Sequence, residues 1–285
     1  CQMFLTNDDG STSSAGGAAA IKWSADHGAV ISQNSWGYNY DRDGDGKLTG
    51  EERTEALNAR ITVSDKAAVD YFIKYAGCDN RGNQLPNSPM KGGVVIFAAG
   101  NDAITMGAPA EYDSVIAVGS VAADGSRSSF SNYGEWVDIC APGTNIMSTI
   151  PGSKYSNMSG TSMACPHVSG VAALVVSHFK GKGFTNETLT EKLIKGANKS
   201  AISKNAKIGA LVDAFGAMTY GGVTPPKGVS SADVKPRSNN LDFTWKVTSD
   251  PDDKKAYGFI LLAAKDKNLF NLFDPAKLPE GMHSA

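Results

Sequence analysis

Residues 157–170 have the sequence NMSGTSMACPHVSG, which places Ser162 between a glycine turn and a run of small residues typical of a buried helix. At a helix N-terminus, unpaired backbone N–H groups and the positive end of the helix dipole can hold the oxyanion that forms when a serine attacks a carbonyl. A serine after a glycine is often only a helix cap. The whole ordered run favours the other interpretation, and we predict that Ser162 is a nucleophile.

The run Gly160–His167 closely resembles the nucleophile motif of the subtilisin-like serine proteases, the subtilases. The resemblance covers residues 1 to about 220 and rests on three separate blocks in the family's order. It implies an α/β fold with a mostly parallel sheet and helices on both faces, lacking the family's N-terminal strands. It also implies a serine endopeptidase that hydrolyses peptide bonds through Ser162.

The first block is Val30–Gly37, VISQNSWG, which resembles the family's strand whose end pairs with the bound peptide. An extended substrate can add to such a strand by backbone hydrogen bonds, while pockets beside it bind alternate side chains. The resemblance makes Ser35, Trp36 and Gly37 substrate-binding residues, with Trp36 as a subsite wall. Ordinary packing of an aromatic side chain at a strand end is the alternative for Trp36.

The second block is Phe97–Asn101, FAAGN, at the expected end of a parallel strand, where ligands of open α/β sheets bind. By resemblance, Asn101 is the oxyanion donor, acting with the backbone N–H of Ser162. Ala98, Ala99 and Gly100 would line the primary specificity pocket. An Asn-Asp turn after a strand would explain Asn101 by itself, but not its position between the other two blocks.

The family's catalytic Asp and His motifs, which belong upstream of these blocks, do not occur in this chain. Asp26-His27 is a superficial candidate, but it falls at the end of an alanine-rich helix. His167 lies five residues beyond Ser162, so the two side chains do not share a face of the helix. A triad serine needs a base to take its proton and a carboxylate to orient that base. We therefore expect the chain to be part of a longer protease, inactive without an N-terminal segment.

Two alternatives to an active protease stay open. The first is a catalytically dead subtilase fragment that binds a peptide or an inhibitor and carries a calcium clip. The second is an α/β-hydrolase esterase, in which Asp213 and His283 would follow the serine, although the second glycine of the Gly-x-Ser-x-Gly motif is missing.

Residues 41–52, DRDGDGKLTGEE, fit the EF-hand calcium loop at every defining position. Three carboxylates two residues apart would repel one another without a cation among them, and Gly46 allows the sharp turn. A solvated acidic turn is the alternative. The predicted ligands are Asp41, Asp43, Asp45, Lys47 through its carbonyl, Thr49 and Glu52. Because many extracellular calcium sites are weak, this cofactor favours an extracellular, periplasmic or cell-surface location.

Apolar runs and helical patterns alternate over the first 220 residues, which is typical of a parallel sheet covered on both faces. Residues 162–179 are apolar or small nearly all round, so we expect that helix to run through the core. The expected strands are 2–5, 29–32, 94–98, 115–119 and 136–139, and the expected helices are 14–27, 51–76, 162–179, 187–196 and 212–218.

At residues 221–226, GGVTPP, the composition changes to that of a linker. Residues 241–248 then alternate apolar and polar side chains, as a half-buried strand does, and residues 257–264 supply a second strand. About 65 residues are too few for an ordinary β-sandwich of roughly 100. We expect a catalytic domain over residues 1–220 and an incomplete β-sandwich-like segment over residues 221–285.

Composition bounds the partners. The chain has 285 residues, a net charge of −2, 41% hydrophobic and 20% charged residues, and no basic run, so nucleic acid is not expected to bind. No apolar run reaches the ~20 residues that span a bilayer. Four separated cysteines suggest neither zinc nor a disulfide framework, and Cys165 is expected to be a core thiol. The expected partners are a protein or peptide substrate and the missing N-terminal segment.

Overall fold

The computed structural model describes residues 14–203, 206–221, 229–236 and 241–247. The chain divides into two compact units, Cys1–Gly221 and Gly222–Ala285, and each is described by itself. The strands expected over residues 2–5 and 257–264 lie outside the described residues.

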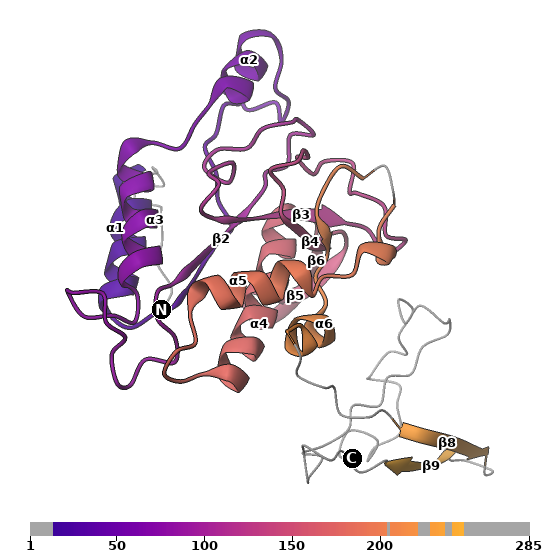
Figure 1. Cartoon of the computed structure of the whole chain (residues 1–285). Coiled ribbons are helices and arrows are strands. Elements are labelled where there is room, and N and C mark those ends of the chain that lie inside the picture. The colour runs from indigo at the N-terminus through magenta and orange to yellow at the C-terminus, as the bar shows by residue number, and fades with distance from the viewer. Residues whose placement is uncertain (1–13, 204–205, 222–228, 237–240, 248–285) are drawn as a thin grey trace. The chain divides into compact units, whose positions relative to one another are not determined.

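The first unit is built on a five-stranded sheet in which all neighbouring strands are parallel (Figure 1). Every residue of the second strand, VVIFA, is buried, because a parallel sheet covered on both faces leaves no solvated side. In spatial order the strands are β1 (Ile31–Asn34), β2 (Val94–Ala98), β3 (Ile116–Val121), β4 (Ile139–Pro142) and β7 (Ala210–Leu211).

Helices cover both faces of this sheet, which confirms the predicted α/β fold. Side chains of β2 alternate between two cores. Ile96 faces the core shared with helices α4 (Thr161–Phe179), α5 (Asn186–Lys195) and α6 (Ala214–Thr219). Phe97 faces the core shared with α1 (Ser14–Asp26) and α3 (Val63–Tyr75), which pack side by side (Figure 1).

One predicted helix is wrong. Residues 51–76 form two helices, α2 (Gly50–Asn58) and α3, rather than one. The break is stabilised by Thr62, whose hydroxyl oxygen accepts a hydrogen bond from the Asp65 N–H at 3.2 Å and so caps α3. A local capping residue thus overrides the helical pattern on either side of it.

Other differences concern boundaries. The strand expected at 29–32 is found at 31–34, and the strand expected at 136–139 is found at 139–142. The sequence prediction also missed the short strand β7 and an antiparallel hairpin formed by β5 (Ile146–Ile150) and β6 (Lys154–Met158). The hairpin is exposed on one face, so it lacks the continuous apolar pattern of the sheet strands.

Helix α4 is buried on one side only, contrary to the prediction that it runs through the core. Ala164, Val168, Ala172 and Val175 are fully buried against the sheet. The opposite side exposes small and apolar residues, and 55% of Leu174 is accessible. The exposed positions of α4 are Pro166, His167, Gly170, Ala173, Leu174, Ser177 and His178.

In the described part of the chain, α4 is also the one helix long and apolar enough to pass a test for a membrane span. Its inner side packs against β1, β3 and β4. Packing against the sheet accounts for the apolar residues on that side of the helix.

The described part of the second unit is an antiparallel pair, β8 (Val229–Pro236) and β9 (Leu241–Val247). The strand predicted from the alternation over residues 241–248 is therefore present. The register shifts between Val229 and Ser231, where the pairing is irregular.

Candidate active site

Ser162 lies in the first turn of α4, directly beside the carboxyl end of β1. Its Oγ donates a hydrogen bond to the Ser35 carbonyl oxygen at 3.4 Å, and the Ser35 hydroxyl donates to the Ser162 carbonyl oxygen at 2.9 Å. The two segments are 127 residues apart in sequence. The packing of α4 on the sheet therefore brings the predicted nucleophile to the strand end predicted to bind peptide.

Asn101 follows the end of β2 and is oriented by Thr161. Its Oδ1 accepts hydrogen bonds from the Thr161 backbone N–H at 2.8 Å and from the Thr161 hydroxyl at 2.9 Å. Oδ1 is thus bonded to the first residue of α4, and Nδ2 lies near Gly160, the residue before it. A Cβ on Gly160 would lie 3.7 Å from Asn101 Nδ2 and 3.6 Å from the Ser162 backbone N. Both predicted oxyanion donors thus lie near the same point beside Gly160.

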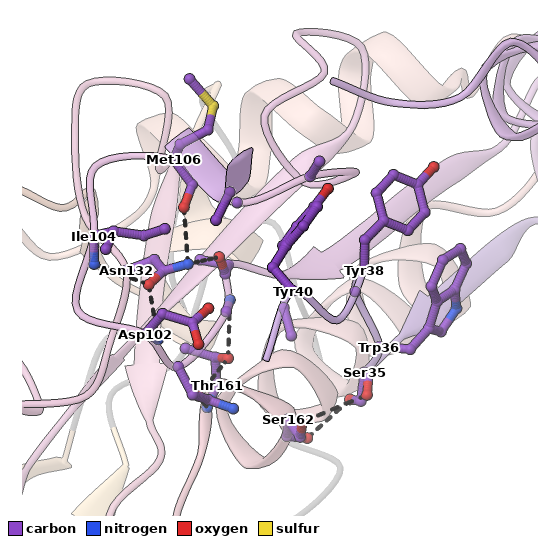
Figure 2. Close-up of a pocket in the computed structure, with 18 residues that line it drawn as sticks. Ser35, Trp36, Tyr38, Tyr40, Asp102, Ile104, Met106, Asn132, Thr161 and Ser162 are labelled. Carbon is purple, nitrogen blue, oxygen red and sulfur yellow. Dashed lines mark hydrogen bonds between the residues drawn. The ribbon is translucent and has the colours of Figure 1, made fainter. Parts of the chain in front are cut away.

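A pocket of about 220 Å³ opens beside Ser162 (Figure 2). All the residues predicted to bind substrate line it, together with Ser162 and Asn101. These substrate residues are Ser35, Trp36, Gly37, Ala98, Ala99 and Gly100. Trp36 lies at the pocket and packs edge-to-face on Phe97, with ring centroids 5.1 Å apart.

Sequence reasoning missed much of the pocket's lining. The additional residues are Tyr38, Tyr40, Ala56, Asp102, Ile104, Met106, Gly107, Ala108, Asn132 and Thr161. The alternation of Trp36, Tyr38 and Tyr40 after a strand is a signal that could have pointed to the tyrosines. No local signal marks Asn132, which comes from the segment between β3 and β4.

Asp102 and Tyr40 are titratable side chains of the pocket with shifted pKa values that nearby carboxylates influence. Desolvation raises the pKa of Asp102 above its ordinary value, and the charge of Asp41 acts in the same direction. Burial raises the pKa of the Tyr40 hydroxyl to about 12, and the charges of Glu111 and Glu55 add to that shift. Tyr40 is therefore protonated at any physiological pH and offers a hydrogen-bond donor in the pocket wall.

The histidines of the described segments are engaged away from the Ser162 hydroxyl. His167 Nδ1 bonds to the Met163 carbonyl oxygen at 2.8 Å, within α4. His27 bonds to the Trp23 carbonyl oxygen and stacks on the Trp23 ring at 3.7 Å, and His178 packs against Phe179. His283 lies outside the described residues. Among the described residues no general base contacts Ser162 Oγ.

Two other residues considered from the sequence, Cys165 and Asp213, have structural roles. Cys165 is fully buried between α4 and the sheet, and burial raises the pKa of its thiol to about 11. Asp213 caps α6, because its Oδ1 accepts a hydrogen bond from the Gly216 N–H at 2.9 Å. Neither arrangement supplies a second nucleophile or an esterase carboxylate at the pocket.

The predicted calcium loop folds into a compact turn between β1 and α2. Carboxylate oxygens of Asp41, Asp43 and Asp45 lie within 4.8 Å of one another. Asp41 accepts hydrogen bonds from the Gly44 and Gly46 N–H groups at 2.7 and 2.9 Å, and Gly46 has φ of +77°.

The other predicted ligands, Lys47, Thr49 and Glu52, are arranged differently. Lys47 N–H donates to Asp45 Oδ1 at 2.8 Å. The carboxylate of Glu52 accepts from the backbone N–H groups of Arg42 at 2.9 Å and Thr49 at 3.3 Å. Glu52 thereby ties the two ends of the loop together, and it is not part of the cluster of three aspartates.

The sequence of this chain matches a known family. A sequence model of the subtilase family matches residues 2–217. The chain belongs to the subtilase family. The resemblance predicted from the three sequence blocks is therefore confirmed.

Individual relatives are also subtilisins or serine proteinases by name. The thermophilic serine proteinase of Bacillus sp. strain AK1 is 40% identical over 186 residues, which cover 63% of this chain and 44% of that protein. Subtilisin J of Geobacillus stearothermophilus is 47% identical over 146 residues, which cover 51% of this chain and 33% of that protein. The matched part of the chain thus spans less than half the length of these curated relatives.

A solved structure, that of a cold adapted subtilisin-like serine proteinase, also resembles this chain. It matches with a TM-score of 0.52 and 27% identity, covering 73% of this chain and 63% of that chain. More than a third of the solved chain therefore has no counterpart in the match.

Proposed function

We propose that this subtilase chain is the nucleophile-bearing part of a serine endopeptidase. Ser162 attacks the scissile carbonyl, and Asn101 Nδ2 and the Ser162 N–H stabilise the oxyanion. The observation that carries the proposal is that Asn101 Nδ2 and the Ser162 N lie within 3.7 Å of one point beside Gly160, with Thr161 holding the Asn101 amide by hydrogen bonds of 2.8 and 2.9 Å. Proteins or peptides are the substrates, held as an extended strand along Ser35–Gly37.

We further propose that the base and its orienting carboxylate come from polypeptide upstream of Cys1, so that residues 1–285 alone are inactive. In support, no histidine or carboxylate of the described segments contacts Ser162 Oγ, whose recorded partner is the Ser35 carbonyl oxygen. The greater length of the relatives also supports it. Activity restored by adding the upstream polypeptide is the test of this proposal.

An open surface beside Ser162 suits such a segment. Among the described residues, β1 is the terminal strand of the sheet, and no described strand pairs with its outer edge. The exposed side of α4 adjoins it, since α4 packs on β1. A parallel strand added to β1 would end near Ser162, because carboxyl ends of parallel strands meet at one edge of a sheet. The rest of the upstream segment would cover the exposed side of α4.

This docking surface can be tested with Leu174→Glu. Leu174 is 55% exposed in the chain, so the variant should fold and melt like the wild type. A buried charge would oppose binding of the upstream segment, and we expect binding of that separately expressed segment to weaken at least tenfold by titration calorimetry. Phe215→Glu, at another exposed apolar residue (62%) on α6, is the matched control and should bind normally. Equal binding by both variants would rule out this surface.

The alternative is a catalytically dead fragment that binds a peptide or inhibitor. Such a binder would not need a preorganised oxyanion site, whereas Thr161 makes two hydrogen bonds that orient Asn101. We therefore favour the protease. The alternative would be supported if the upstream polypeptide bound the chain and no hydrolysis appeared.

We also propose that residues 41–52 bind calcium. The donor set fits a hard cation, because three carboxylates converge within 4.8 Å and Gly46 has the positive φ that the sharp turn needs. Asp41, Asp43 and Asp45 would hold the ion, with the Lys47 carbonyl, Thr49 and Glu52 completing its shell. The ion would stabilise the segment between two pocket residues, Tyr40 and Ala56 of α2.

Calcium removal should lower the stability of the wild type. At a hundredfold excess over Kd, binding stabilises the folded state by ~2.7 kcal/mol. The double variant Asp43→Asn/Asp45→Asn keeps the acceptor oxygens for the turn but removes two charges, and its melting temperature should not respond to calcium. Asp79→Asn, in a similar exposed turn, should respond like the wild type. A wild type that melts identically with calcium and with chelator would show that the loop binds no calcium.

A weak calcium site would be filled outside the cytosol, where calcium is abundant. Together with membership of the subtilases, this supports our proposal that the protein is secreted or acts in the periplasm or at the cell surface. Detection of the mature protein in a cytosolic fraction alone would contradict it.

A further inference from the structure

Asn132 is a fully buried polar residue in contact with the loop that carries Asn101 (Figure 2). It comes from the segment between β3 and β4, about thirty residues further along the chain. Its side chain uses its whole hydrogen-bonding capacity on the backbone of residues 99–106. Nδ2 donates to the carbonyl oxygens of Ala99 at 3.0 Å and Met106 at 2.9 Å, and Oδ1 accepts from the N–H groups of Asp102 at 3.0 Å and Ile104 at 3.1 Å.

These bonds hold both neighbours of the oxyanion donor. Asp102 bonds to the Asn132 side chain, and the Gly100 carbonyl oxygen accepts from the Asn132 backbone N–H at 3.0 Å. Asn101 lies between these two anchored residues. Thr161 orients its amide from the other side. The position of the donor therefore depends on Asn132 through the backbone.

The same amide shapes the pocket. Gly100 has φ of +103°, and a side chain on it would collide with Asn132 Nδ2. A side chain on Gly107 would approach Nδ2 to 3.1 Å and the Trp136 ring to 2.9 Å. Two glycines of the pocket wall are thus packed against one buried amide, which joins the start of the loop at Ala99 to its end at Met106.

We propose that Asn132 is a positioning residue of this protease, which sets both the oxyanion donor and the width of the specificity pocket. The expected effect of Asn132 on catalysis rests on the proposed function, whereas its effect on the position of residues 99–106 does not. Neighbouring backbone bonds, from Ala103 N–H to the Phe130 carbonyl oxygen and from Tyr133 N–H to the Ile104 carbonyl oxygen, keep the loop attached. The Asn132 side chain then fixes the positions of residues 99–106 relative to one another.

Amide hydrogen exchange on residues 1–285 is the first test, and it needs no activity. Asn132→Ala removes the acceptor for the Asp102 and Ile104 amides, and we expect both to exchange about five to ten times faster. Asn132→Asp keeps two acceptor oxygens and should restore most of that protection. Asn186→Ala is the matched control, because Asn186 is also buried and its Nδ2 bonds two carbonyl oxygens far from the pocket. Equal exchange of the two amides in Asn132→Ala and Asn186→Ala would overturn the proposal.

Kinetics of the protease joined to its upstream polypeptide give the second test. A displaced donor lowers kcat, and a distorted pocket raises KM. Asn132→Asp would also turn a carboxylate toward the carbonyl oxygens of Ala99 and Met106, so both Asn132 variants should lose up to about 100-fold in kcat/KM. Asn186→Ala should lose little. Unchanged kcat and KM in Asn132→Ala would overturn the positioning role, whereas inactivity of the wild type as well would contradict the proposed function and leave exchange to decide on Asn132.

Discussion

Purified residues 1–285 are expected to hydrolyse casein or a chromogenic tetrapeptide no faster than their Ser162→Ala variant. The serine hydroxyl needs a base to accept its proton, but Ser162 Oγ donates its hydrogen bond to the carbonyl oxygen of Ser35 at 3.4 Å. In subtilisin, itself a member of this family, loss of the triad histidine or serine lowers kcat by about 10⁶. An effect of that size hides any residual turnover.

The matched experiment adds the upstream polypeptide, fused to the chain or expressed separately. Hydrolysis should then rise by several orders of magnitude in the wild type and stay at background in Ser162→Ala. If the chain alone hydrolysed peptides and Ser162→Ala did not, the base would lie within residues 1–285. That result would contradict our proposal while leaving Ser162 as the nucleophile.

In the joined protease, Asn101→Ala is expected to lower kcat with little change in KM. The oxyanion exists in the transition state and not in the bound substrate, so the lost hydrogen bond affects turnover more than binding. Loss of such a donor costs about 10²–10³ in kcat, a magnitude established for subtilisin itself. Steady-state kinetics on a soluble peptide measure both constants.

Asn157→Ala provides the control for this prediction. Asn157 is an exposed asparagine on β6, close in sequence to the nucleophile. It should leave kcat nearly unchanged. An Asn101→Ala enzyme that loses no more than the Asn157→Ala enzyme would show that Asn101 is not the oxyanion donor.

The sequence was sufficient to predict the features that depend on short, ordered motifs. Parallel strands end at one edge of the sheet, so Ser35 and Asn101, which follow two neighbouring strands, had to lie at the same edge. Ser162 joins them because its glycine turn begins a helix whose buried face packs on the same strands. These side chains line one pocket in the structure.

Features that depend on tertiary contacts could not be predicted. Asn132 looks like any loop asparagine until the fold brings it against residues 99–106. The helix pattern over residues 51–76 conceals the cap at Thr62. The apolar and small residues all round α4 indicated a core helix, and only the structure shows that one side of it is exposed.

Labelling of Ser162 with a low concentration of a fluorophosphonate tests the central claim most directly, because the reagent reacts far faster with a serine activated by its base than with other hydroxyl groups. The mass of the intact protein and of its Ser162 peptide reports the adduct. We predict no adduct on residues 1–285 alone and one adduct, on Ser162, when the upstream polypeptide is present, lost in Ser162→Ala. An adduct on another residue, or none on Ser162 in an assembled protease that hydrolyses peptides, would contradict the account.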